Sequence, residues 1–338
     1  MVDQRATKFT EIQIPVPWGH VCGRWYGNQS IPPLIALHGW LDNCGTFAKL
    51  APLIAEAAGS VLCIDLPGHG HSSHLPVGIL YDNLEFVRIL MRLMKAYNWT
   101  KISLMGHSMG GAIGFYFASL HPSKVDLLIS IDVVLRRFFK PNYAVEALKY
   151  TMSKALLDNQ RLVDATPLQE PPSYTFAECE RLLYEGSGRS MLLENCKYIL
   201  ERNLSRSKKF PQKYYFSRDT RLKYLIDLNP EEVLSKAMAK RISDAEIPFM
   251  VIRGGASTNI DSASKELIRF LSEHNKNFET HLIADGTHHF HLDQPVVVAN
   301  MIIPFLKRYR PLTVLEAQQQ QQQQLVGIKG ELLPKGKL

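Results

Sequence analysis

The chain has 338 residues, of which 46% are hydrophobic and 21% are charged, and its formal net charge is +7. This composition is typical of a globular protein and excludes fibrous and wholly disordered chains. The five cysteines are scattered and lack CxxC spacing, which argues against a secreted disulfide framework and against a zinc ribbon, and indicates a reducing compartment.

The sequence shows no pattern of membrane insertion or secretion. No apolar run reaches about 18 residues, so we expect no transmembrane segment. The first residues lack the apolar stretch of a signal peptide, and we therefore expect a cytoplasmic protein. The last three residues, Gly336-Lys337-Leu338, differ at one position from the peroxisomal Ser-Lys-Leu signal, so a peroxisomal location is the alternative.

Over the first 135 residues, short apolar runs alternate with helical patterns. Two exposed strands at 9–16 and 20–26 come first. The alternation that follows, with short connections, predicts a parallel sheet with right-handed crossovers. The expected buried strands are 33–38, 60–65, 101–105 and 125–132, and the expected helices are 47–58, 82–97 and 111–120.

The pattern changes between residues 136 and 239, where helical stretches occur without a convincing buried strand. We expect residues 136–239 to form a helical cap inserted over the sheet, with helices at 144–158, 176–184 and 190–203. The alternation then resumes with strands at 247–252 and 278–283 and helices at 262–274 and 295–309. Residues 1–135 and 240–310 are thus the expected core, and the glutamine-rich residues 311–338 are expected to be a disordered tail.

The positive charge is concentrated in residues 202–223, which contain eight basic side chains and one acid, Asp219. Such a segment predicts either a solvated face or a surface that attracts an anionic substrate. No nucleic-acid recognition motif accompanies it, so we expect no nucleic-acid partner.

The motif that carries most chemistry is Gly106-His107-Ser108-Met109-Gly110, between an expected strand and an expected helix. A G-x-S-x-G sequence in this position is the signature of a nucleophile elbow, a tight turn that exposes the serine. The residues two before and two after the serine must be small, and both are glycine. We therefore expect Ser108 to be a nucleophile.

A serine hydroxyl needs a general base that is held by a third group. His288, His289 and His291 follow the last expected strand, and their spacing favours His288 as the base. His289 and His291 are expected to pack or to form hydrogen bonds at the start of the next helix. We expect no metal site in this cluster, because the sequence shows no carboxylate partner for it, and we expect no cofactor.

The acid has two candidates. Asp132 ends the strand that follows the elbow helix, and we favour it; Asp261 lies in the loop after strand 247–252 and is the alternative. A Gly-x-x-Asp pattern in that loop would place an acid at position 257, but the residue there is Ser257. Either aspartate could instead cap a helix or occupy a turn.

Acyl transfer also needs hydrogen-bond donors for the oxyanion. The backbone N–H of Met109 comes with the elbow. The second donor is expected from the loop after strand 33–38, where the N–H of Trp40 is the candidate.

These motifs, in this order, resemble those of the α/β-hydrolase superfamily over about residues 1–135 and 240–310. They are His38-Gly39-Trp40, residues 65–72 (DLPGHGHS), residues 106–111 (GHSMGG) and the late histidine. Residues 215–222 (YFSRDTRL) further resemble the serine hydrolase-like proteins of animals, the kraken-like group.

The resemblance implies an α/β-hydrolase fold, a mostly parallel central sheet flanked by helices with an inserted helical cap. It also implies Ser108 as nucleophile, His288 as base, and Trp40 and Met109 as oxyanion donors. Epoxide hydrolases and haloalkane dehalogenases of the superfamily use an aspartate nucleophile, so Ser108 argues against both activities.

We therefore expect a serine hydrolase that cleaves carboxylic esters through an acyl-enzyme, with a small-molecule ester as its partner. One alternative is an acyl-CoA thioesterase, whose anionic substrate would meet the basic segment. The other is a non-catalytic α/β-hydrolase scaffold that binds a ligand. The sequence carries no indication of the oligomeric state.

Overall fold

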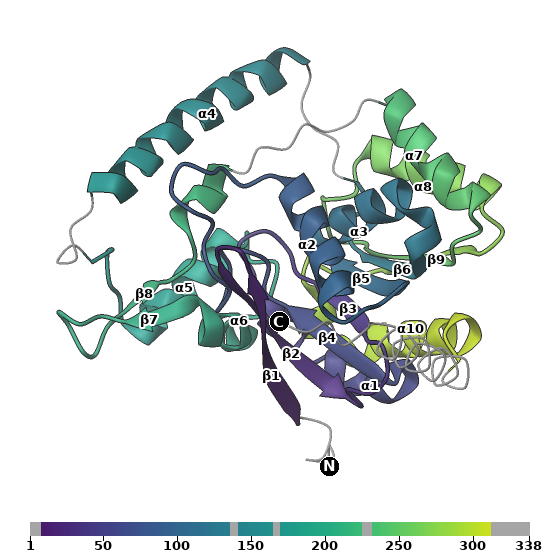
Figure 1. The fold of residues 1–338 in the computed structure, drawn as a ribbon, viewed down its shortest axis with the longest axis horizontal. Helices are drawn as coiled ribbons and strands as arrows, with labels where there is room; N and C mark the ends of the chain where they lie inside the picture. The colour runs from purple at the N-terminus through teal and green to yellow at the C-terminus, as the bar shows by residue number, and fades with distance from the viewer. Residues whose placement is uncertain (1–7, 136–140, 165–169, 225–231, 312–338) are drawn as a thin grey trace, which may run out of the picture.

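The computed structural model describes residues 8–135, 141–164, 170–224 and 232–311 (Figure 1). Its centre is an eight-stranded sheet in the order β1-β2-β4-β3-β5-β6-β9-β10. Strands β1 and β2 form one edge, where β1 pairs with β2 and β2 pairs with β4 in antiparallel orientation. The remaining neighbours, in the order β4-β3-β5-β6-β9-β10, pair in parallel. The strands are β1 (Phe9–Val16), β2 (Gly19–Gly27), β3 (Leu34–Leu37), β4 (Ser60–Ile64), β5 (Ile102–His107), β6 (Val125–Ile131), β9 (Phe249–Gly254) and β10 (Phe278–Ile283).

Helices cover both faces of the sheet, which explains why the central strands are continuous apolar runs. Along β3, Leu34 and Ala36 belong to one hydrophobic cluster and Ile35 and Leu37 to the other, as the two-residue period of a strand requires. One face packs against α1 (Ala51–Ala58) and α10 (Pro295–Tyr309). The other packs against α2 (Asn83–Ala96), α3 (Met109–Leu120), α7 (Glu232–Asp244) and α8 (Ser262–His274).

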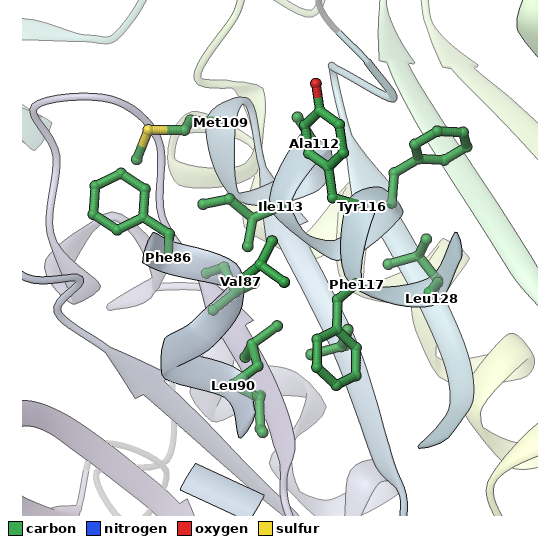
Figure 2. Close-up of a cluster of buried hydrophobic side chains, with 14 of the residues drawn as sticks. Phe86, Val87, Leu90, Met109, Ala112, Ile113, Tyr116, Phe117 and Leu128 are labelled. Atoms are coloured by element: carbon green, nitrogen blue, oxygen red, sulfur yellow. The ribbon is translucent and has the colours of Figure 1, made fainter. Parts of the chain in front are cut away.

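Figure 2 shows part of the hydrophobic cluster on the face covered by α2 and α3, at the place where these two helices meet. Phe86 and Leu90 of α2 and Ile113 and Phe117 of α3 are fully buried or nearly so. Asp82 begins α2 by accepting a hydrogen bond from the N–H of Glu85 at 2.7 Å, which supplies a partner for one of the free N–H groups at a helix start.

The segment between β6 and α7 carries helices α4 (Pro141–Asp164), α5 (Phe176–Gly186) and α6 (Cys196–Asn203). It also contains two short strands that the sequence did not predict, β7 (Leu204–Arg206) and β8 (Tyr214–Phe216). Neither strand has a fully buried residue, so neither shows a buried apolar pattern. The glutamine-rich tail expected beyond residue 311 lies outside the described residues, and the assignment of residues 136–239 as a cap stays a proposal.

No helix within the described ranges is both long enough and apolar enough to cross a membrane.

A buried ion pair joins α6 to the loop after β4. Arg202 and Asp65 are both fully buried, and Arg202 Nη2 lies 2.7 Å from Asp65 Oδ2. Arg202 Nη1 also contacts Glu11 of β1 at 2.5 Å. Burial alone would raise the pKa of Asp65, but the Arg202 guanidinium holds it below its ordinary value.

The expectation of a solvated or substrate-attracting face is therefore wrong for two residues of the basic segment. Arg202 pairs with Asp65, and Arg221 pairs with Asp219 at 2.7 Å, with both partners buried. The partner of Arg202 lies far away in the sequence, and the partner of Arg221 lies two residues away. Sequence position alone does not reveal that either pair is buried.

We predict that Arg202→Met lowers the free energy of unfolding by about 3–5 kcal/mol, because it leaves Asp65 buried without its cation. Urea denaturation measures the change. Arg206→Met, which removes an exposed guanidinium from β7, is the matched control and should stay within about 0.5 kcal/mol of the native protein. Equal effects of the two substitutions would contradict a structural role for the ion pair.

Candidate active site

Ser108 occupies a tight turn between the end of β5 and the start of α3. Its backbone angles are φ 52° and ψ −118°, which a residue with a Cβ rarely adopts. A Cβ on Gly106 would lie 2.1 Å from the carbonyl carbon of Gly110, and a Cβ on Gly110 would lie 2.0 Å from the carbonyl oxygen of Leu37. The turn therefore requires glycine at both positions, for the steric reason that the sequence suggested.

His288, in the loop after β10, lies against Asp132, which follows β6. The two side chains are joined by a 2.6 Å contact from His288 Nδ1 to Asp132 Oδ2. The Asp132 carboxylate is fully buried and also accepts hydrogen bonds from the N–H of Gly254, at 2.9 Å, and from the hydroxyl of Ser257. The structure thus brings together two of the predicted residues, 156 positions apart in the chain.

Ser108 and His288 line one cavity of about 800 Å³. Its walls come from the loops at the carboxyl edge of the sheet and from the segment that precedes α7, including parts of α5. Trp40 also lines it and is 45% exposed, with its indole N–H donating to the carbonyl of Leu222 at 2.7 Å.

Met109 is the first residue of α3, so its N–H has no acceptor within the helix. Its side chain packs into the hydrophobic cluster beside Phe86 rather than lining the cavity (Figure 2). Only the backbone of Met109 is thus placed to act at the turn, as the predicted oxyanion role requires.

Burial lowers the pKa of His288 below its ordinary value, and the hydrogen bond to Asp132 opposes that shift only in part. The imidazole is therefore neutral at pH 7. Because Nδ1 donates its proton to Asp132, the lone pair of the neutral ring is on Nε2. This is the protonation state that a general base needs.

Comparison with known proteins shows which family the chain belongs to. Residues 32–295 match the family described as the alpha/beta hydrolase fold. The chain belongs to the α/β-hydrolase family.

Similarity to individual proteins extends over most of the chain. A probable serine hydrolase of Drosophila melanogaster is 35% identical over 88% of this chain and 87% of its own length. A serine hydrolase-like protein of Mus musculus is 29% identical over 90% of this chain and 97% of its own. A solved thioesterase domain from the curacin biosynthetic pathway, 21% identical, superposes with a TM-score of 0.70 over 88% of this chain and 99% of that domain. The expected fold and the resemblance to serine hydrolase-like proteins are confirmed.

The alternative acid of this α/β-hydrolase, Asp261, has a different place in the structure. It caps α8 by accepting a hydrogen bond from the N–H of Ser264 at 2.8 Å. Ser257 has a role that the sequence did not reveal, because its hydroxyl donates to Asp132. The loop after β9 thus supports the carboxylate of Asp132 instead of supplying its own acid.

His289 and His291 form the hydrogen bonds expected of them. His289 Nδ1 lies 2.8 Å from Ser190 Oγ, and His291 Nε2 lies 2.9 Å from Thr46 Oγ1. The expectation that the late histidines lack a carboxylate partner is wrong, because His288 contacts Asp132 and His289 Nε2 lies 3.4 Å from Asp42. Both aspartates come from loops far away in the sequence, so spacing could not indicate them.

Among the residues that the structure describes, Asp42, His107 and His289 could together hold a metal ion. All three are buried, and their ligand atoms lie within 4.8 Å of one another.

We predict that Asp132→Asn lowers the pKa of His288 by about 1–3 units, because the negative charge that stabilises the imidazolium is lost. NMR titration of the imidazole protons measures the change, with His288→Gln to assign the signal. In the native protein the midpoint should lie below about 6.5. Asp261→Asn is the matched control and should leave the titration unchanged; a larger shift in that variant would reverse the assignment of the acid.

Proposed function

We propose that this α/β-hydrolase cleaves carboxylic esters through an acyl-enzyme on Ser108. The observation that carries the proposal is the contact between His288 and Asp132, at the cavity that Ser108 lines. It supplies a neutral, oriented imidazole as general base at the site of a half-buried serine that lines the cavity. Relatives named serine hydrolases support the same reaction class.

The proposed reaction has two steps. Nε2 of His288 takes the proton of Ser108 as Oγ attacks the ester carbonyl, and the N–H groups of Met109 and Trp40 bind the oxyanion. The intermediate collapses, His288 gives its proton to the departing alkoxide, and an alcohol leaves. Water then attacks the acyl-enzyme with His288 again as base, and the acid product leaves Ser108 with its proton restored.

The donors at the oxyanion are expected to supply about 2.7–4 kcal/mol each to the barrier reduction. Asp132 is buried and does not accept the proton itself; it fixes the ring and stabilises the imidazolium that forms in each step.

Replacing Ser108 tests the proposal. We predict that Ser108→Ala lowers kcat for 4-nitrophenyl butyrate by about 10⁶-fold, the loss typical of removing the nucleophile of such a triad. Ser272→Ala, on the exposed part of α8, is the matched control and should retain full turnover. Undiminished turnover by purified Ser108→Ala would rule out Ser108 as nucleophile.

A second candidate function, hydrolysis of anionic esters or acyl-CoA thioesters, is favoured by Arg218. This residue of the basic segment lines the same cavity as Ser108. Its Nη1 is buried without a hydrogen-bond partner among the described residues, and its guanidinium lies 4.7 Å from the centre of the Phe216 ring. Burial lowers the pKa of Arg218, but a guanidinium stays charged at neutral pH. A partly buried cation of this kind is stabilised by an anionic group on the substrate.

We predict that Arg218→Met lowers kcat/KM for the 4-nitrophenyl ester of succinic acid and for butyryl-CoA by about 10- to 100-fold, the value of a charge-assisted hydrogen bond. The uncharged 4-nitrophenyl butyrate should be hydrolysed as before. Arg206→Met serves as the control. An equal loss of kcat/KM on charged and uncharged substrates would contradict the second candidate function, but it would not contradict the hydrolysis of uncharged esters.

A further inference from the structure

Three potential ligand atoms meet at one side of the cavity. Asp42 Oδ2 lies 3.4 Å from His289 Nε2 and 3.8 Å from His107 Nδ1. All three side chains are buried and line the cavity. Within the part of the chain that the structure describes, Asp42 Oδ2 and His107 Nδ1 are buried without a hydrogen-bond partner, and such buried polar atoms are rare in folded proteins.

The hydrogen bonds around the cluster determine where its protons are. Nε2 of His107 must carry a proton, because it lies 2.9 Å from the carbonyl oxygen of His288, which can only accept. Ser190 gives its hydroxyl proton to the carbonyl of Ser187 at 2.7 Å and therefore accepts from Nδ1 of His289. Each ring thus donates from the nitrogen that faces away from Asp42 and directs its other nitrogen toward that carboxylate.

Neither ring therefore offers a hydrogen to Asp42 Oδ2, and three potential ligand atoms converge with no hydrogen bond among them.

A metal cation satisfies all three acceptors at once, whereas a water molecule has only two hydrogens to donate. In a tetrahedral site with metal–ligand distances of about 2.0–2.1 Å, neighbouring ligand atoms lie about 3.3 Å apart. The two separations from Asp42 Oδ2 are close to that spacing and too long for good hydrogen bonds. One carboxylate and two imidazoles suit Zn²⁺ and similar ions.

We propose that Asp42, His107 and His289 bind a divalent transition-metal ion such as Zn²⁺, with the fourth coordination position open to the cavity. The hydrogen bonds to the His288 carbonyl and to Ser190 orient the two rings, as partners behind metal ligands usually do.

The site is next to the proposed catalytic residues, since His107 precedes Ser108 and His289 follows His288.

Metal binding is tested with the full chain after chelator treatment, by titration with Co²⁺ alone. We expect the visible absorption bands of four-coordinate Co²⁺, saturating near one ion per chain and abolished by Zn²⁺. Asp42→Asn and His289→Gln should weaken Co²⁺ binding by more than about 100-fold, since loss of an outer partner alone costs 10- to 100-fold. His274→Gln, an exposed histidine at the end of α8, is the control and should bind normally.

Absent Co²⁺ bands in the native protein, or unchanged bands in both cluster variants, would overturn the site whatever the enzyme's activity. If the cluster variants fail to fold, Arg218→Met provides an independent test, because Arg218 lines the same cavity as Asp42 and interacts with it electrostatically. Removing this competing cation should tighten Co²⁺ binding by roughly 10-fold. Unchanged or weakened binding would count against the site.

Discussion

The tight turn between β5 and α3 is the constraint on which the rest of the site depends. The turn forces Ser108 to a positive φ and leaves no room for a side chain at Gly106 or Gly110. Because β5 lies in the middle of the sheet, the turn emerges at the carboxyl edge with β3 on one side and β6 on the other. Any polar residue at the ends of the neighbouring strands can then approach the serine, as is usual for ligand sites in parallel sheets.

The strand order β5-β6-β9-β10 explains how residues so far apart in the chain come together. Each successive strand end contributes one part of the site: Ser108 after β5, Asp132 after β6, Ser257 after β9 and His288 after β10. Asp132, itself at a positive φ, is the centre of this chain of contacts, since both Ser257 and His288 bond to its carboxylate. The loop after β9 lacks an acid and supports the acid of the neighbouring strand.

Most of the strands and helices of the core and the turn around Ser108 could be predicted from the sequence, because local sequence patterns agree with the fold. The capped helix after Asp82 and the glycines around Ser108 are determined by neighbouring residues, so short windows suffice. The choice between Asp132 and Asp261 is different, because it depends on where two loops lie in space. Asp42 and the buried Arg202 escaped prediction for the same reason, since their partners come from distant segments.

The proposed mechanism depends most directly on the reactivity of one hydroxyl, that of Ser108. Labelling the full chain with a fluorophosphonate and locating the adduct by peptide mass spectrometry measures that reactivity. We expect a single adduct, on Ser108, that forms much more slowly in His288→Gln. A protein that remains unlabelled, or an adduct that persists in Ser108→Ala, would contradict the account and favour a scaffold that binds without catalysis.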